Sequence, residues 1–217
     1  MTNTIVYGTT YSVYVRIVRL ALEEKHEDYD LIDVDIFADD PGPNAQRHPF
    51  HRIPTFHHDG FDLYETGAIV RYLDDAIPNP PLMPDEPKHR ARVNQIISML
   101  DNYAYPSWVW GLYVQLVSNP VEGRMTDDNI VEASITKAKT CLESIADLRP
   151  KNGTFLINDR VSLADIYAVP MYSYLTMTDI GRQLVADTDW PQWWENMRGR
   201  DSVVRTRFDD EISATKN

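Results

Sequence analysis

A proline-rich stretch constrains the fold of this chain more than any other feature of its sequence. Residues 77–87 read Ile-Pro-Asn-Pro-Pro-Leu-Met-Pro-Asp-Glu-Pro, with five prolines in eleven positions. Proline lacks a backbone N–H, so this stretch cannot continue a helix or join a β-ladder, and it is typical of a linker between domains. The chain therefore divides into residues 1–79, a linker over 80–87, and residues 88–217.

The first 25 residues show a strand followed by a helix. A short apolar run over residues 5–7 ends at Gly8. Beyond it, Val15, Val18 and Leu22 recur at the spacing of one helix face, which predicts a helix to about residue 25.

The rest of the segment before the linker adds strands and a second helix. Apolar and acidic residues alternate over 31–36 and predict a strand, while Asp59-Gly60 between two short apolar runs predicts a hairpin. Residues 66–76 form a predicted helix. The order strand, helix, strand, hairpin, helix is that of a compact α/β module.

Strand signals fade after the linker, and helical patterns dominate. Helices are predicted over residues 88–117 with a bend at Pro106, and over 127–148, 162–177, 190–197 and 201–208. The inward face of the second of these is predicted to hold Ile130, Ala133, Ala138, Leu142 and Ile145. Ser162 and Asp165 stand three residues apart and form a predicted capping box at the start of the third.

Charge and cysteine content narrow the class of protein. The formal net charge of −12 argues against a nucleic-acid partner. No apolar run approaches the length of a membrane span, and the first residues do not resemble a secretory signal. The single cysteine, Cys141, excludes an internal disulfide and fits a reducing compartment. We therefore expect a cytoplasmic protein, with Cys141 buried in a helix and inert.

Ser12 stands just ahead of the first predicted helix and has two readings. As a helix cap, its hydroxyl only satisfies a backbone N–H. As a functional group, the hydroxyl lies with unpaired N–H groups at the positive end of a helix dipole, where an anion is stabilised.

Four separated segments carry a resemblance to the cytosolic glutathione transferase family, and the resemblance extends over essentially the whole chain. They are Ser12–Lys25, His48–Pro54 with the sequence His-Pro-Phe-His-Arg-Ile-Pro, Tyr64–Leu73 with Glu-Thr-Gly-Ala-Ile, and Val161–Asp165. The first resembles the opening helix of the bacterial serine-type classes (theta-, phi- and nu-like). The region from Trp190 to Val203 is also similar to the family's C-terminal region.

The resemblance implies a fold and an activity. The fold would be an α/β, thioredoxin-like, glutathione-binding domain followed by an all-helical C-terminal domain. The activity would be that of a detoxification enzyme. Glutathione would serve as co-substrate, without a metal, and its thiolate would attack a small hydrophobic electrophile. A cytoplasmic homodimer that binds neither nucleic acid nor membrane is expected from the family.

The resemblance also implies roles for particular residues. Ser12 would donate a hydrogen bond to the glutathione sulfur, while Ile53 would present its backbone to the cysteinyl part through a cis bond to Pro54. Thr66 and Glu65 would bind the γ-glutamyl end. Their alternatives are structural: a strand-start proline for Pro54 and ordinary capping for Glu65 and Thr66.

Four further residues have assigned roles with open alternatives. Arg52 would meet the glycyl carboxylate, or else is a solvated surface arginine. Tyr11 would lie in the substrate site, and it is also the one serious rival to Ser12 for thiol activation, since other classes of the family use tyrosine. Tyr105 or Trp108 would face the electrophile, although an aromatic band on a helix is mostly core.

The sequence leaves two alternatives to a glutathione transferase, and it contains one group of histidines that suggests a metal site. A glutathione-dependent isomerase usually shows a Ser-Ser-Cys run, from which Thr10-Tyr11-Ser12 departs. A non-enzymatic interaction module could keep the same fold. His48, His51, His57 and His58 beside Asp59 match no common metal-ligand spacing, so we expect exposed histidines and no metal.

Overall fold

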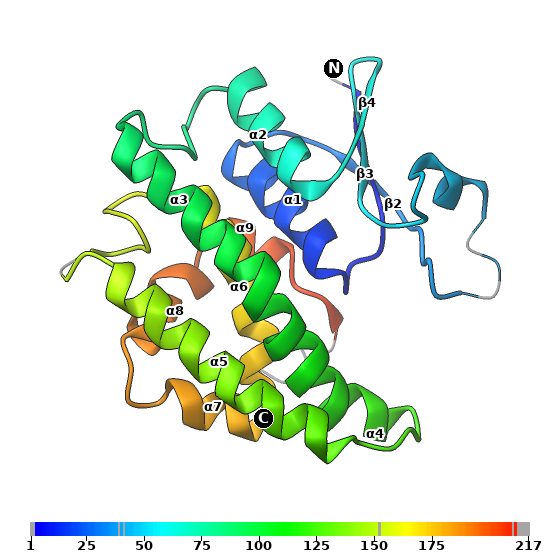
Figure 1. Ribbon diagram of the computed structural model, residues 1–217. Helices are drawn as coiled ribbons and strands as arrows, with labels where there is room; N and C mark the ends of the chain where they lie inside the picture. The colour runs from blue at the N-terminus through cyan, green and yellow to red at the C-terminus, as the bar shows by residue number, and fades with distance from the viewer. Residues whose placement is uncertain (1–2, 39, 41, 152, 210, 212–217) are drawn as a thin grey trace. The chain divides into compact units, whose positions relative to one another are not determined.

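The computed structural model describes residues 3–38, 40, 42–151, 153–209 and 211, drawn in Figure 1. Their contacts group them into two compact units. The first unit consists of the residues through Leu82 together with a C-terminal segment that begins at Arg200, and the second runs from Met83 to Gly199.

The first unit contains the sheet. Its elements are β1 (Thr4–Tyr7), α1 (Val13–Glu24), β2 (Asp30–Ile32), the 3-10 turn η1 (Pro43–Arg47), β3 (Thr55–His58), β4 (Phe61–Tyr64), α2 (Thr66–Ala76) and α9 (Asp201–Arg205). The strand order is β2-β1-β3-β4. β1 is parallel to β2 and antiparallel to β3, and β3 is antiparallel to β4. The predicted α/β character of this part is confirmed.

Helix α1 forms where the apolar spacing predicted it. Val15, Val18 and Leu22 are fully buried. Burying one such side chain contributes roughly 1.5–3 kcal/mol, so this face fixes α1 in the first unit.

The hairpin also follows the sequence. Asp59 and Gly60 have φ angles of 48° and 86°. Two positive values in succession are those of a type I′ turn, which matches the twist of the strands it joins. The strand predicted over 31–36 is shorter than expected, because β2 ends at Ile32 and Val34 packs instead against Tyr7 and Ala45.

The second unit is helical, as predicted. Its elements are α3 (Pro87–Met99), η2 (Leu100–Ser118), α4 (Asn119–Val121), α5 (Asp128–Leu148), α6 (Leu163–Thr176), α7 (Asp179–Val185) and α8 (Trp190–Arg198). The first three form one continuous helical run in which η2 has wider π-type turns and contains Pro106. No residue pattern predicted α7, which has only seven residues and is capped by Thr178.

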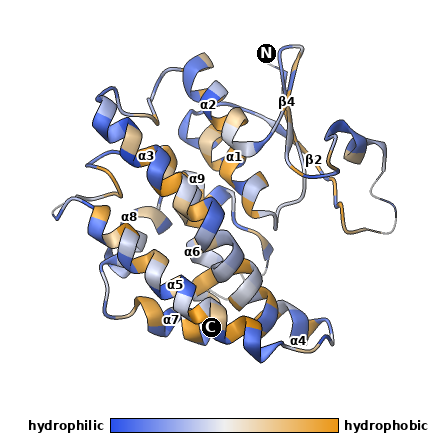
Figure 2. Cartoon of the chain, viewed as in Figure 1, coloured by the Kyte–Doolittle hydropathy of each residue, from blue (hydrophilic) through white to orange (hydrophobic). Residues whose placement is uncertain are grey.

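The buried face of α5 differs from the prediction at its N-terminal end. Ile130 and Ala133 are exposed, and the buried row begins instead with Val131 and Ser134. Polar and apolar residues alternate along this helix in Figure 2. A Cβ added to Gly111 would lie 1.9 Å from the Ser134 hydroxyl oxygen, so a small polar residue faces a glycine where η2 and α5 approach closely. A pattern based on apolar residues alone therefore misplaces this face.

Cys141 is buried in α5, and burial raises the pKa of its thiol to about 12. At pH 8 only about one thiol in ten thousand would be ionised, and the thiolate is the reactive form. We expect no alkylation of the native protein by iodoacetamide and complete alkylation in urea, measured by intact mass. Stoichiometric labelling of the native protein would contradict this placement of Cys141.

Among the residues that the structure describes, no helix is long and apolar enough to cross a membrane.

Candidate functional site

One end of the sheet gathers the start of two helices and a cis proline. Tyr7, Thr55 and Tyr64 are paired side by side across β1, β3 and β4. The residues next to them in sequence, Gly8, Pro54 and Glu65, therefore lie at the same sheet edge. Helices α1 and α2 begin just beyond it (Figure 1), so two sets of unpaired backbone N–H groups open near this edge.

Ser12 is the N-cap of α1. Its backbone is extended, with φ −69° and ψ 125°, and its Oγ accepts a hydrogen bond of 3.4 Å from the Val15 N–H. The side chain is half-buried, and its hydroxyl donates no hydrogen bond to any of the described residues. The capping reading of Ser12 is therefore confirmed, and the hydroxyl proton is available to a ligand.

Gly8 allows the turn into α1 to pass close to its neighbours. A Cβ at this position would lie 2.3 Å from Cγ2 of Val15 and 3.4 Å from Cβ of Ile53. The first distance is far inside a normal carbon–carbon contact of about 3.5–4.0 Å. Glycine therefore lets the loop before Ser12 pack directly against the Ile53–Pro54 segment.

The peptide bond between Ile53 and Pro54 is cis, as the resemblance implied. Pro54 is buried, while Ile53 is half-buried and packs against the cluster formed by Tyr7, Val34 and Ala45.

Glu65 adopts an uncommon backbone conformation. Its φ is 71° and its ψ is 110°, and its carboxylate is 61% exposed. A non-glycine residue at positive φ costs of order 1–3 kcal/mol, and such residues cluster at functional sites. The next residue, Thr66, is buried, and its hydroxyl donates a 3.5 Å hydrogen bond to the Tyr14 carbonyl of α1. This bond joins the first turns of the two helices.

His48 packs beneath Glu65. Its Nδ1 accepts a hydrogen bond of 3.2 Å from the Phe50 N–H, which leaves the proton on Nε2, 3.6 Å from Oε1 of Glu65. Burial lowers the pKa of His48, the Glu65 carboxylate opposes this shift, and the charge of Arg52 adds to it. His48 is therefore neutral near pH 7. Arg52 itself is exposed, as a surface arginine would be.

The expectation of exposed histidines is wrong at two positions. His48 and His58 are buried, and Nδ1 of His58 lies 2.8 Å from the Tyr72 hydroxyl. Aromatic neighbours cover these two rings, which a spacing argument cannot foresee. Within the described part of the chain, no group of three or more His, Cys, Asp or Glu side chains is arranged to hold a metal ion.

Tyr11 is exposed and anchored to a loop. Its hydroxyl donates a 2.7 Å hydrogen bond to Oδ1 of Asp35. A tyrosine whose proton is already held by a carboxylate is a poorer donor to a thiolate than Ser12.

The two aromatic candidates of the helical unit differ. Trp108 is fully buried, and its ring meets the ring of Trp190 edge-on at 5.8 Å. This is a core position, which corrects the expectation that Trp108 faces a substrate. Tyr105 is half-buried, with its ring edge-on to Trp110.

Comparisons with known proteins give a consistent result. Residues 6–81 match the family model described as "Glutathione S-transferase, N-terminal domain". A probable glutathione S-transferase GSTF1 of Oryza sativa subsp. japonica is 27% identical and covers 94% of this chain and 95% of its own length. A maleylacetoacetate isomerase of Mus musculus is 26% identical over 78% of this chain and 82% of its own length.

A solved structure extends the likeness to the fold of the whole chain. Glutathione S-transferase I from mais, in complex with an atrazine glutathione conjugate, has a TM-score of 0.82 and 26% identity. The match covers 99% of this chain and 98% of that one. The fold is therefore a thioredoxin-like domain with a four-stranded mixed sheet, followed by a helical domain.

Proposed function

We propose that the chain is a glutathione transferase of the cytosolic glutathione S-transferase family, on the grounds of its site geometry and of its similarity to the family model and relatives described above. The observation that carries the proposal is the placement of Ser12. A neutral hydroxyl with a free proton caps α1 at the sheet edge where the cis Ile53–Pro54 bond and the start of α2 also lie.

The reaction requires the glutathione thiolate. A free thiol has a pKa of about 8.5, so little thiolate exists at neutral pH. Lowering this pKa to about 6.5 needs about 2.7 kcal/mol of preferential stabilisation of the anion. One charge-assisted hydrogen bond from Ser12 contributes about 1.5–3 kcal/mol, and the end of the α1 dipole adds about 0.3–1 kcal/mol. Together, the hydrogen bond and the helix dipole can supply the required stabilisation of the thiolate.

The other site residues hold the tripeptide in register with Ser12. The Ile53 backbone N–H and C=O, presented by the bond to Pro54, pair with the cysteinyl backbone. The start of α2 at Thr66 binds the γ-glutamyl carboxylate, as helix N-termini bind anions. The exposed carboxylate of Glu65 binds the ammonium group, and Arg52 meets the glycyl carboxylate.

The second substrate is a small hydrophobic electrophile. The sulfur attacks an electron-poor carbon, a C–S bond forms, and the leaving group departs with its electron pair. Tyr11 and Tyr105 are the proposed aromatic contacts for this substrate. We also propose a cytoplasmic homodimer of the serine-type class, with the domains divided at the proline-rich linker over residues 80–87.

Conjugation of glutathione to a chlorinated dinitrobenzene tests the proposal. We expect the purified protein to form the thioether and release chloride at least tenfold faster than the uncatalysed mixture, measured by absorbance. Cysteinylglycine, which lacks the γ-glutamyl group, is the matched control and should react at least tenfold more slowly, because it cannot contact Glu65 and Thr66. If thioether formation is no faster than in the uncatalysed mixture and the protein is not retained on immobilised glutathione, the protein is an interaction module with the same fold and not a transferase.

A second candidate is a glutathione-dependent cis–trans isomerase, favoured by the likeness to the isomerase of Mus musculus. It would use the same thiolate, adding it to a conjugated double bond and expelling it again after rotation. Glutathione is then regenerated, so the absence of net thiol consumption distinguishes this reaction from conjugation.

A further inference from the structure

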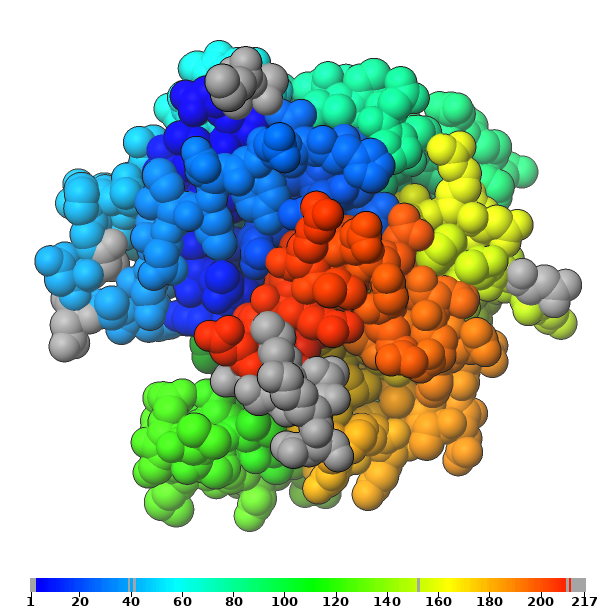
Figure 3. Space-filling model, turned by 180° about the vertical axis from the view of Figure 1, so that it is seen from behind, coloured from blue at the N-terminus to red at the C-terminus, as the bar shows by residue number. Residues whose placement is uncertain are grey.

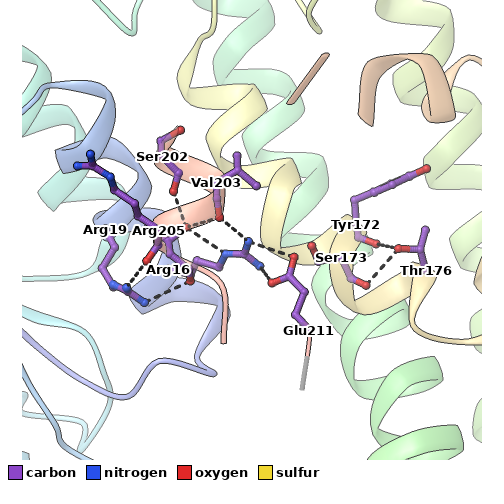
Figure 4. A network of polar contacts seen from close by, with 10 residues as sticks. Arg16, Arg19, Tyr172, Ser173, Thr176, Ser202, Val203, Arg205 and Glu211 are labelled. Carbon is purple, nitrogen blue, oxygen red and sulfur yellow. Dashed lines mark hydrogen bonds and ion pairs between the residues drawn. The ribbon is translucent and has the colours of Figure 1, made fainter. Parts of the chain in front are cut away.

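A buried polar network ties α1 to the C-terminal segment of the same unit (Figure 4). Arg16 is only 1% exposed, and its guanidinium donates to both carboxylate oxygens of Glu211, at 2.5 and 3.3 Å. The same guanidinium donates to the Thr206 hydroxyl at 3.4 Å and to the Val203 carbonyl at 3.5 Å. Arg16 therefore has acceptors at three positions of a segment about 190 residues further along the chain.

The network continues along the length of α1. Arg19 donates to the carbonyls of Thr206 and Arg205, at 3.3 and 3.2 Å. Near the end of α1, Glu24 accepts from Arg200 at 2.7 and 2.8 Å and from Ser202 at 2.5 Å. Burial would raise the pKa of Glu24, but the bonds from Arg200 and Ser202 outweigh it and lower the pKa.

We call these contacts of α1 with residues 200–209 and 211 the latch. In Figure 3 the red atoms of this segment lie against the blue atoms of the first unit. A buried ion pair adds little net stability over an apolar pair of the same shape, because desolvation offsets the attraction. What the latch provides is a fixed axial and rotational position for α1.

That position matters at the Ser12 end of the helix. The Arg16 N–H donates a 2.9 Å bond to the Ser12 carbonyl, so the residue that carries the latch also closes the first turn behind the cap. A hydrogen bond from Ser12 to a thiolate depends on distance and angle, and a small displacement of the helix end weakens it.

We propose that Arg16, held by Thr206 and Glu211, is a positioning residue that aims Ser12 at the glutathione sulfur. This inference rests on the proposed function for its catalytic consequence but not for its structural part. It assigns the C-terminal segment a role in thiol activation although none of the residues proposed to bind glutathione or the electrophile lies in that segment.

Thr206→Val tests the inference without changing any charge. Substituting Arg16 or Glu211 would strand a buried charge and risks unfolding the protein. Valine has the shape of threonine and removes the hydroxyl that accepts from Arg16 and that also donates a 2.8 Å hydrogen bond to the Ser202 carbonyl. The matched control is Arg205→Gln on the same helix. It removes an exposed ion pair with Glu23 of α1 but keeps the Arg205 carbonyl that accepts from Arg19.

Two readouts separate the structural part from the catalytic part. Amide hydrogen exchange of residues 15–17 without glutathione should be about fivefold faster in Thr206→Val than in the wild type, which corresponds to one net hydrogen bond. The thiolate fraction of bound glutathione at about pH 6.5, measured by ultraviolet absorbance, should fall about threefold. Arg205→Gln should change neither quantity.

Each outcome decides a different claim. Unchanged exchange in Thr206→Val, or the same change in Arg205→Gln, would overturn the inference. Faster exchange with an unaltered thiolate fraction would also overturn it, since α1 would then loosen without affecting the sulfur. If the wild type forms no thiolate, the proposed function fails while the exchange result still tests the positional claim.

Discussion

Ser12→Ala should lower kcat/KM for conjugation about 15-fold at about pH 6.5, since it removes one charge-assisted hydrogen bond of about 2 kcal/mol. Without that bond the pKa of the bound thiol should rise from about 6.5 to about 8. The loss should therefore shrink as the pH is raised, because the thiolate then forms without help from the protein. A pH–rate profile from about pH 6 to about pH 9 measures both effects.

Two variants control for the lost helix cap and for the rival tyrosine. Ser12→Thr keeps a capping hydroxyl, and it should retain most of the activity. Tyr11→Phe removes a hydroxyl that is bonded to Asp35, and it should change kcat/KM at most about threefold. If Tyr11→Phe moves the thiol pKa and Ser12→Ala does not, the roles of the two residues are exchanged.

Asp165→Asn should destabilise the helical unit by about 4 kcal/mol. Asp165 is fully buried at the start of α6, and its carboxylate accepts four hydrogen bonds. Oδ1 accepts from the Leu156 N–H and the Trp193 indole, and Oδ2 accepts from the Ser162 N–H and hydroxyl. An asparagine amide would turn an NH₂ group toward one of these donor pairs. Each buried donor left unsatisfied costs about 1–3 kcal/mol.

Asp127→Asn is the matched control for this substitution. Asp127 caps α5 in the same unit, but it is exposed, and asparagine caps equally well. Urea unfolding followed by tryptophan fluorescence should show a large drop in midpoint for Asp165→Asn and a shift of less than about 0.5 kcal/mol for Asp127→Asn. Equal effects of the two variants would mean that burial of the Asp165 network is not what stabilises α6.

Local rules in the sequence predicted much of this fold. Ser12 as a cap, Asp59-Gly60 as a hairpin and Ser162 with Asp165 as a capping box are each encoded within four residues, and all three are present. The cis bond before Pro54 came from the resemblance and not from the local pattern. The gathering of Ser12, Pro54 and Glu65 at one sheet edge needed the strand register, which the sequence did not contain explicitly.

Two features that the sequence did not predict involve polar residues whose contacts lie far away along the chain. The buried row on α5 was misplaced because Ser134 is polar yet packs against Gly111. The pairing of Arg16 with Glu211 spans 195 residues and leaves no periodic trace. Two arginines at i and i+3 on an otherwise buried helix were the only hint that a distant acceptor must exist.

The return of the chain to its first unit has a consequence for biosynthesis. While the ribosome is still adding α3 to α8, Arg16 and Arg19 have already left the exit tunnel without their acceptors on the C-terminal segment. The sheet and α1 can pack together early, but the contacts between α1 and the C-terminal segment can form only after Glu211 has been translated. We therefore expect that the first 82 residues do not form the complete first unit on their own. A fragment ending at the proline-rich stretch would expose the side chains of Arg16 and Arg19, which are buried in the full chain.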